Sequence, residues 1–225
     1  MQLVARFWGS ALGKKLVMAI TGLLMVGFVV VHMAGNLQVF VGAEKLNAYA
    51  DLLHGPLAEL VWISRVVLLG AVALHVTAAV QLTRRAQAAR PDGYARRTPQ
   101  VSTFASRTIR WGGALLLVFI VLHILHFTTR TLFPADLQDQ SVKIFSLVTD
   151  EGLGFRNPLV AGFYVLSMAG LGLHLFHGVW SSPRTLGLAP ATNDPIKRRL
   201  ALGLAVVVAV GFAAVPLAIF LGLVK

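Results

Sequence analysis

Six histidines lie inside long apolar stretches of this sequence. The stretches read VVVHMAGN, VALHVTAA, VLHILHF and LGLHLFHGVW. The histidines are His32, His75, His123, His126, His174 and His177. Ionisable side chains among hydrocarbon neighbours are rare in membrane proteins and usually have a function there. A neutral imidazole nitrogen is also a common metal ligand, so metal binding is the first chemistry to consider.

The elements that carry these histidines are predicted to be transmembrane helices. Of the 225 residues, 56% are hydrophobic and only 13% are charged, whereas soluble domains average about 25% charged residues. Crossing a bilayer takes about 20 apolar residues, and five stretches meet this length, at about 15–37, 59–82, 108–130, 158–180 and 200–223. Backbone polar groups in lipid must be satisfied within their own segment, which favours helices. We therefore expect an all-α integral membrane bundle of five transmembrane helices, forming a single domain over residues 1–225.

The charged residues indicate how this bundle is oriented. Fourteen of the 20 Lys and Arg residues precede the first span or lie in the second–third and fourth–fifth connections. The other two connections hold most of the acidic residues. The positive-inside rule then predicts a cytoplasmic N-terminus and an outer C-terminus. The net charge of +11 is thus explained by topology and by attraction to anionic lipid or an acidic soluble partner, with no nucleic acid expected.

Depth in the bilayer sorts the histidines into two levels. With a rise of about 1.5 Å per residue, His75 and His174 each lie roughly 22 Å inward from the outer ends of their spans. His32 lies about 24 Å, and His123 about 20 Å, outward from the cytoplasmic ends of theirs. Each level therefore receives one histidine from each of two helices.

Two histidines facing each other across a bundle core can hold a b-type haem by both axial positions. Two pairs predict two haem b groups, at levels that differ by about 13 Å. Zinc would need three or four ligands at one level. The chain has no cysteine, which excludes covalent c-type attachment and cysteine-bound iron–sulfur clusters. His126 and His177 each follow their neighbour by three residues, so either could replace it as a ligand. The alternative is that each histidine only anchors a neighbouring helix by a hydrogen bond.

Arginines near the ends of the spans are candidates for binding haem propionates, because a guanidinium pairs with a carboxylate in two places. Arg107, Arg110 and Arg184 are placed to serve the inner haem, although setting the topology explains them equally well. Arg65 is the only basic residue well inside an apolar span. An unpaired charge there is costly, so Arg65 is expected to serve the outer haem.

With these residues in view, the chain resembles the single-chain, five-helix, dihaem cytochrome b subunits (b558 type) of succinate:quinone oxidoreductases, which are succinate dehydrogenases or fumarate reductases. The resemblance covers essentially the whole chain. It rests on GKKLVMAITG, VHMAGNLQVFVGAEKLNAYADLLH, ALHVTAAVQL, ASRTIRWGG, LHILHF and GFYVLSMAGLGLHLFHGVWSSPRTLGL. The family implies an axial histidine on each of the first four helices, paired first with third and second with fourth: His32, His123, His75 and His174. The pattern H-x-x-x-G-x-W favours His174 over His177, and His123 is preferred to His126.

The resemblance also implies partners and a place in the cell. The chain would anchor a flavoprotein that handles succinate and fumarate, and an iron–sulfur protein, on the cytoplasmic face of a prokaryotic inner membrane. Electrons would pass from the iron–sulfur protein through the inner and outer haems to a quinone, with menaquinone expected, and this chain would carry no dicarboxylate chemistry. Polar candidates for an outer quinone site are Asn36, Gln38, Glu44, Asn47 and Glu59. Among them, Glu44 or Glu59 could exchange protons with the quinone.

One position departs from part of this family. Some dihaem fumarate reductases carry a glutamate two residues before the fourth-helix histidine, linked to transmembrane proton movement, and this chain has Gly172 there. A proton path of that kind is therefore not expected.

Two other functions remain open at this point. One is the dihaem cytochrome b of a membrane hydrogenase or formate dehydrogenase, which typically has four helices and other histidine spacings. The other is a haem-free membrane anchor or transporter.

Overall fold

The computed structural model describes residues 2–89, 102–188 and 195–224, and within these ranges it contains helices and turns but no strand. Its α-helices are α1 (Gln2–Gly9), α2 (Ala11–Asn36), α3 (Ala43–His54), α4 (Ala58–Ala88), α5 (Phe104–His123), α6 (Ile144–Val148), α7 (Pro158–Thr185) and α8 (Pro195–Phe220). Short 3-10 turns span Leu37–Phe40 and Ala135–Leu137, and a π-helical turn spans Ile124–Thr128. Five segments are long and apolar enough to cross a membrane: Ala11–Phe40, Ala58–Ala88, Phe104–Thr128, Pro158–Thr185 and Pro195–Phe220. The predicted all-α architecture with five such helices is confirmed, as expected for a multi-pass membrane protein.

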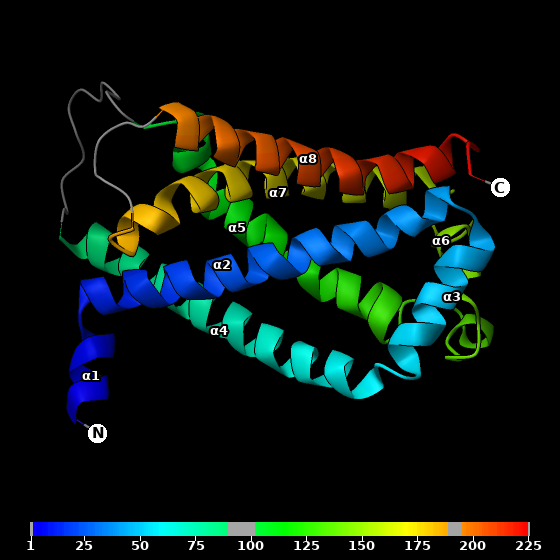
Figure 1. Ribbon diagram of the computed structural model, residues 1–225, viewed down its shortest axis with the longest axis horizontal. Helices are drawn as coiled ribbons and strands as arrows, with labels where there is room; N and C mark the ends of the chain where they lie inside the picture. Colours follow the sequence, from blue (N-terminus) through cyan, green and yellow to red (C-terminus); the bar gives the residue numbers. More distant parts are fainter. Residues whose placement is uncertain (1, 90–101, 189–194, 225) are drawn as a thin grey trace.

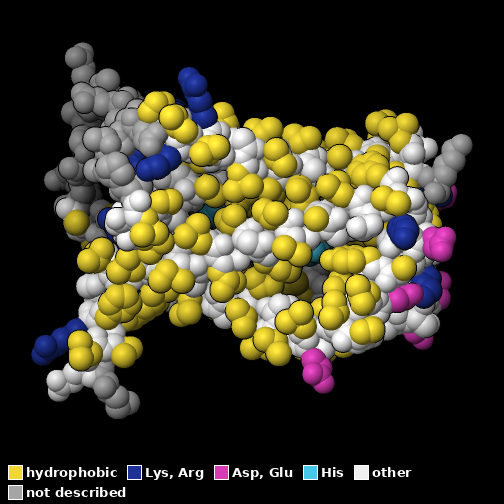
Figure 2. Space-filling model, viewed as in Figure 1, with side chains coloured by type: hydrophobic (Ala, Val, Ile, Leu, Met, Phe, Trp, Pro, Cys, Tyr) yellow, Lys and Arg dark blue, Asp and Glu magenta, His cyan; other side chains and the backbone are white. Residues whose placement is uncertain are grey.

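The long helices lie side by side, with their ends gathered at two opposite ends of the molecule (Figure 1). Helix α2 packs against α4 and α7, α5 packs against α7, and α8 covers α7 and reaches α2. Hydrophobic side chains cover much of the face between the two ends (Figure 2). This exposed apolar surface is what a bundle surrounded by lipid requires.

Charge differs between the two ends. We call the end formed by α3, the first turn of α4 and residues 129–157, which include α6, the acidic end, and the opposite end, with α1 and the start of α2, the basic end. All acidic residues in the described ranges belong to the acidic end: Glu44, Asp51, Glu59, Asp136, Asp139, Asp150 and Glu151. Acidic side chains are visible there in Figure 2. At the same end, an ion pair of 2.9 Å between Lys143 and Asp51 joins the segment before α6 to α3.

Side-chain caps explain where three of the long helices begin. The Ser10 hydroxyl accepts a hydrogen bond from the Gly13 N–H at the start of α2, at 2.8 Å. Thr103 caps α5 in the same way, and Asn157 caps α7 just before Pro158, which occupies the first helical turn. Such caps satisfy N–H groups that a helix cannot bond internally.

The span boundaries differ from the predicted ones by a few residues. The fifth helix begins at Pro195 rather than near residue 200, because proline suits a first helical turn, and it ends at Phe220 rather than 223. Gly222 then takes a φ of 69°, the left-handed conformation that commonly ends helices. The second and fourth helices extend to Ala88 and Thr185, beyond the predicted 82 and 180.

The third span ends earlier than predicted, at Thr128 instead of residue 130. Arg130 has a φ of 60° and is 4% exposed. Its guanidinium donates to the carbonyls of Asp139 and Val142. Burial lowers the pKa of Arg130, and the nearby Asp139 carboxylate acts in the opposite direction. Arg130 therefore holds the connection over residues 131–143 against the end of α5.

Gly172 on α7 lies against α8. A Cβ atom at this position would stand 3.0 Å from the Cβ of Ala209 and 3.7 Å from the carbonyl oxygen of Ala205. Small residues allow such close approach of helices in membranes. Position 172 therefore faces α8, and a side chain there would require Ala209 to shift by a few tenths of an ångström.

Candidate functional site: two facing histidine pairs

The structure brings four histidines together as two pairs. The ring centroids of His75 on α4 and His174 on α7 are 6.2 Å apart, and the rings are inclined by 53°. The ring centroids of His32 on α2 and His123 on α5 are 5.9 Å apart, with an angle of 73°. These are the pairs that the depth estimate predicts. Four different helices supply them, so the bundle as a whole positions the site.

The pair closer to the basic end, which we call the inner pair, is flanked by glycines from the other two helices. A Cβ atom added to Gly22 on α2 would lie 3.4 Å from Cε1 of His75. A Cβ atom added to Gly113 on α5 would lie 3.7 Å from Cε1 of His174. A Cβ atom at either position would be in ordinary van der Waals contact with the imidazole, so these two glycines lie directly against the rings of the inner pair.

Aromatic rings enclose the outer pair, His32 and His123. Phe28 stacks on His32 with a centroid distance of 5.2 Å, and Phe212 from α8 lies 5.7 Å from the same ring. Phe119 stacks on His123 at 5.5 Å. These contacts fix the planes of both imidazoles and surround them with apolar surface.

A hydroxyl group from α2 contacts one ring nitrogen of His75. The Thr21 Oγ1 donates to the carbonyl of Val17 at 2.7 Å and also lies 3.2 Å from the Nδ1 of His75. A hydroxyl has one hydrogen but can accept two bonds. Since that hydrogen is directed to Val17, the Thr21 oxygen accepts from the His75 Nδ1–H. The Nε2 of His75 is then left with a free lone pair, as a metal ligand requires.

A second hydroxyl contacts both histidines near the end of α5. The buried Tyr164 hydroxyl lies 3.2 Å from the Nδ1 of His123 and 2.9 Å from the Nδ1 of His126. His126 stacks on Phe127 and Phe133, with centroid distances of 3.9 and 4.8 Å. His123, rather than His126, is therefore the α5 histidine whose ring faces the α2 histidine.

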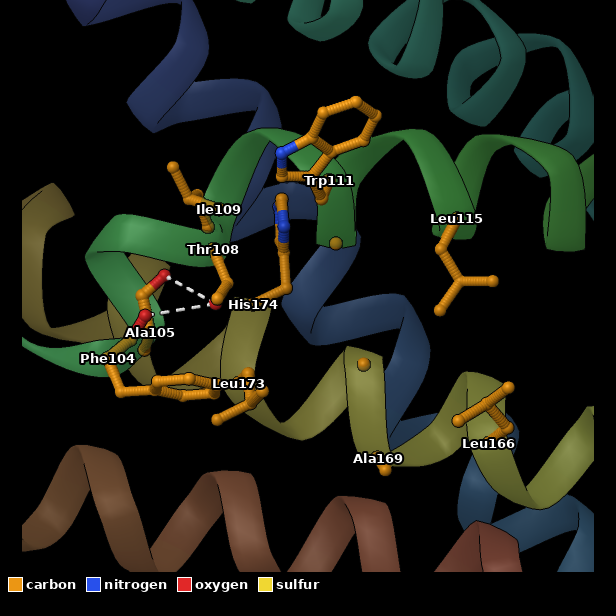
Figure 3. Close-up of a pocket in the computed structure, with 12 residues that line it drawn as sticks. Phe104, Ala105, Thr108, Ile109, Trp111, Leu115, Leu166, Ala169, Leu173 and His174 are labelled. Carbon is orange, nitrogen blue, oxygen red and sulfur yellow. Dashed lines mark hydrogen bonds between the residues drawn. The ribbon is translucent and has the colours of Figure 1, made fainter.

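Open space adjoins the inner pair. A cavity of about 300 Å³ lies between α5 and α7, lined largely by apolar residues that include Trp111 and Leu166. Figure 3 shows the His174 ring rising from α7 toward α5 beside Trp111, at the edge of this cavity. The Thr108 hydroxyl in its wall donates to the Phe104 carbonyl at 3.0 Å, and the Nδ1 of His174 is buried without a hydrogen-bond partner. On another face the molecule is hollowed between α2 and α4, with histidine visible in the recess (Figure 2).

The paired imidazoles fit two axial ligands of one metal. Imidazoles bound on opposite sides of a metal at about 2 Å per nitrogen have centroids about 6 Å apart, close to both observed distances. In the ranges that the structure covers, no group of three or more His, Asp or Glu side chains could share one metal ion. Two protein ligands at each level leave a metal's other positions to a macrocycle, which suits haem better than zinc. Metal ligation by these histidines stays a prediction.

The arginine candidates make local contacts. The guanidinium of Arg65 lies over the ring of Trp62 at 4.8 Å, and that of Arg184 lies over Trp180 at 3.7 Å. The two candidates in the first turns of α5 are exposed: Arg107 and Arg110. These cation–π contacts can hold the two stacked arginines near the ends of their helices. Binding of propionates by any of the four stays a prediction.

The quinone-site candidates divide into two groups. Asn36 donates to the His32 carbonyl at 2.8 Å, and the Oδ1 of Asn47 accepts from a backbone N–H of α6 at 3.1 Å. Asn47 therefore joins α3 to α6. Glu44 and Glu59 are exposed in the first turns of α3 and α4, where they are accessible from the acidic end.

Thr21 and Tyr164 are the site residues that sequence reasoning missed. Each lies on a different helix from the paired histidine that it contacts, so spacing along the chain could not connect them. The available signal was a hydroxyl inside an apolar span, because such a group needs a hydrogen-bond partner. Thr21 belongs to the GKKLVMAITG stretch and Tyr164 to the GFYVLSMAG stretch, both of which also carry the family resemblance.

Searches with the whole chain gave no match to a family model, a curated protein or a solved structure. The functional conclusion below therefore depends on the residues of the site and on the sequence stretches named above.

Proposed function

We propose that this chain is the dihaem cytochrome b membrane anchor of a succinate:quinone oxidoreductase. The observation that carries the proposal is the presence of two facing histidine pairs at two levels of an apolar bundle. A haem b, when bound, accepts and releases single electrons. The chain thus belongs to the quinone-reacting part of the enzyme and contributes no dicarboxylate chemistry.

The histidines of this chain have two tasks in the proposed function. His75 and His174 would hold one haem, and His32 and His123 the other. Because the members of each pair come from different helices, binding would also tie α4 to α7 and α2 to α5. The aromatic and aliphatic side chains around the pairs exclude water, which stabilises a buried macrocycle and influences its redox potential.

The proposed orientation follows from the two ends of the bundle. The basic end would face the cytoplasm of a prokaryotic cell and receive the iron–sulfur protein and, with it, the flavoprotein. The acidic end would face outward, with the quinone near the outer pair and Glu44 or Glu59 in proton exchange. The clustering of acidic side chains at one end and the positive-inside rule support this orientation.

The first experiment is a haem measurement on the purified protein. We expect two b haems per chain, with a b-type band in the reduced-minus-oxidised spectrum. Alanine at any paired histidine should reduce the content by one haem: His32, His75, His123 and His174. His54→Ala is the matched control, because His54 is exposed and its ring is bonded to the Ala50 carbonyl at 2.8 Å. A colourless but folded protein would overturn the proposal and leave a haem-free anchor or transporter.

A second measurement distinguishes the oxidoreductase from other dihaem anchors. Native membranes that contain the chain are treated with succinate, formate or hydrogen, and haem reduction is followed optically. Reduction by succinate alone, together with co-purification of a flavoprotein and an iron–sulfur protein, is expected. Reduction by formate or hydrogen instead would assign the chain to a different dehydrogenase or to a hydrogenase.

A further inference from the structure

A buried line of polar groups leads away from the outer pair toward the acidic end. It consists of the His123 Nδ1, the Tyr164 hydroxyl and the His126 Nδ1, with distances of 3.2 and 2.9 Å between successive groups. His126 is 5% exposed and Tyr164 is 8% exposed. The line therefore lies inside the protein, and bulk water has little access to its hydrogen bonds.

Packing holds each member of this line in place. The Tyr164 ring makes edge contacts with Phe119 at 5.2 Å and Phe155 at 4.9 Å. His126 lies in the π-helical turn Ile124–Thr128 and stacks on Phe133 from the following connection. Single π-helical turns occur frequently at functional sites. Here the turn places a second imidazole against the same phenol that contacts the first.

The number of available hydrogens gives the line a direction, and this step rests on the proposed function. If His123 binds iron through Nε2, its hydrogen is on Nδ1 and must be donated to the Tyr164 oxygen. The phenol has one hydrogen, which it then donates to the Nδ1 of His126. His126 is consequently an acceptor at Nδ1 and protonated on Nε2, which is buried and has no hydrogen-bond partner among the described residues. The second histidine of the VLHILHF stretch thus has a role that does not require it to be a ligand.

We propose that Tyr164 and His126 are positioning residues that fix the tautomer and orientation of His123 and thereby set the redox potential of the outer haem. A group that accepts a hydrogen bond from the free ring nitrogen of a metal-bound histidine fixes the orientation of the ring and raises its basicity. A more basic imidazole favours oxidised iron, so the intact line lowers the potential of the outer haem. Beside the inner pair, Thr21 takes the corresponding place next to His75. Its hydroxyl is bonded onward to a backbone carbonyl and not to a second side chain. The two haems therefore differ in what supports their axial histidines.

The test is a potentiometric titration of the purified protein and its Tyr164→Phe variant. This change removes one oxygen and keeps the ring. We expect two haems per chain in both proteins, an upward shift in the potential of one haem, and no shift in the other. His126→Leu should shift the same haem, which keeps the test decisive if Tyr164→Phe does not fold. The packing control is Phe163→Leu, because Phe163 contacts the Tyr164 ring at 6.0 Å but belongs to neither hydrogen bond; no shift is expected.

A spectroscopic measurement checks the direction of the line. In the reduced protein with ¹⁵N-labelled histidines, the resonance lost in His126→Leu should report a hydrogen on Nε2. A hydrogen on Nδ1 overturns the proposed direction. Unchanged haem potentials in both variants overturn the role of Tyr164 and His126 while leaving the dihaem function intact. A wild-type protein without haem overturns the dihaem function itself, and the role of the line with it.

Discussion

The hydroxyl of Thr21 gives the sharpest quantitative prediction for the inner pair. In the structure this hydroxyl donates to the Val17 carbonyl at 2.7 Å, and its oxygen lies 3.2 Å from the Nδ1 of His75, toward which it can then only accept. Thr21→Val replaces the hydroxyl by a methyl group of similar size and removes both the acceptor for His75 and the donor to the Val17 carbonyl. The His75 imidazole then loses the partner that makes it a stronger electron donor. We therefore expect the potential of the inner haem to rise.

The size of the shift follows from the strength of the lost hydrogen bond. A hydrogen bond contributes a net of about 0.5–1.5 kcal/mol, and only the part that differs between oxidised and reduced iron changes the potential. A tenfold change in an equilibrium constant corresponds to about 59 mV for one electron. A difference near 1 kcal/mol therefore corresponds to roughly 40 mV, which is the upper range for this single contact.

The assay is an optical redox titration of the purified protein, fitted as two one-electron components. Thr21→Ser should keep the wild-type potentials, because it retains the hydroxyl. Ser167→Ala is the matched control: Ser167 is fully buried, and its hydroxyl donates to the Phe163 carbonyl at 2.8 Å. That hydroxyl is bonded within α7 rather than to a paired histidine, so neither haem should shift.

Two results would refute the reasoning about Thr21. An unchanged inner potential in Thr21→Val would mean that the hydroxyl does not act as an acceptor for His75. A fall in the potential would mean that the hydroxyl donates instead, so that His75 would carry its hydrogen on Nε2. The second result would also exclude Nε2 of His75 as the ligating atom.

Three further predictions concern the scaffold. Gly172→Leu should lower the temperature of thermal unfolding in detergent, because a Cβ there already contacts Ala209 and overpacking costs about 1–3 kcal/mol. Gly162→Leu should leave this temperature unchanged, because nothing lies within 4 Å of its Cβ position. Arg130→Ala should speed amide hydrogen exchange over residues 131–143, because it leaves partly buried carbonyls unsatisfied at a cost of about 1–3 kcal/mol. An unchanged exchange rate over these residues would contradict the role given to Arg130. The pKa of Asp139 is lowered chiefly by the hydrogen bond from the Ser141 backbone N–H. The ionised Asp139 carboxylate therefore stabilises the connection fully above the ordinary carboxyl pKa of about 4, and this stabilisation is lost as pH falls through the lower native pKa. In the wild type, the rate of proteolysis of the connection should rise as pH falls through that acid range. In Asp139→Asn, the rate should not change over the same range.

Much of the fold could be predicted because lipid restricts what a chain can do. Apolar length alone identifies five spans, and all five are present as long helices. The predicted boundaries are wrong by a few residues at span ends such as Thr128, where contacts with the following connection determine the last helical residue. The left-handed φ of Arg130 depends on carbonyls of residues 139 and 142, which are distant along the chain, so no local sequence pattern could reveal it.

The candidate site divides in the same way. Depth along a helix is a linear function of residue number, so the sequence by itself paired His75 with His174 and His32 with His123. Rotation about the helix axis and the approach of neighbouring helices depend on packing throughout the bundle. Depth alone left His126 open in place of His123, and the resemblance only preferred His123; the tertiary structure showed that the His123 ring faces the α2 histidine. It likewise decided which hydroxyls support the imidazoles, because Thr21 and Tyr164 come from neighbouring helices. The sequence determined the levels of the chemistry in the membrane, and packing determined the partners at each level.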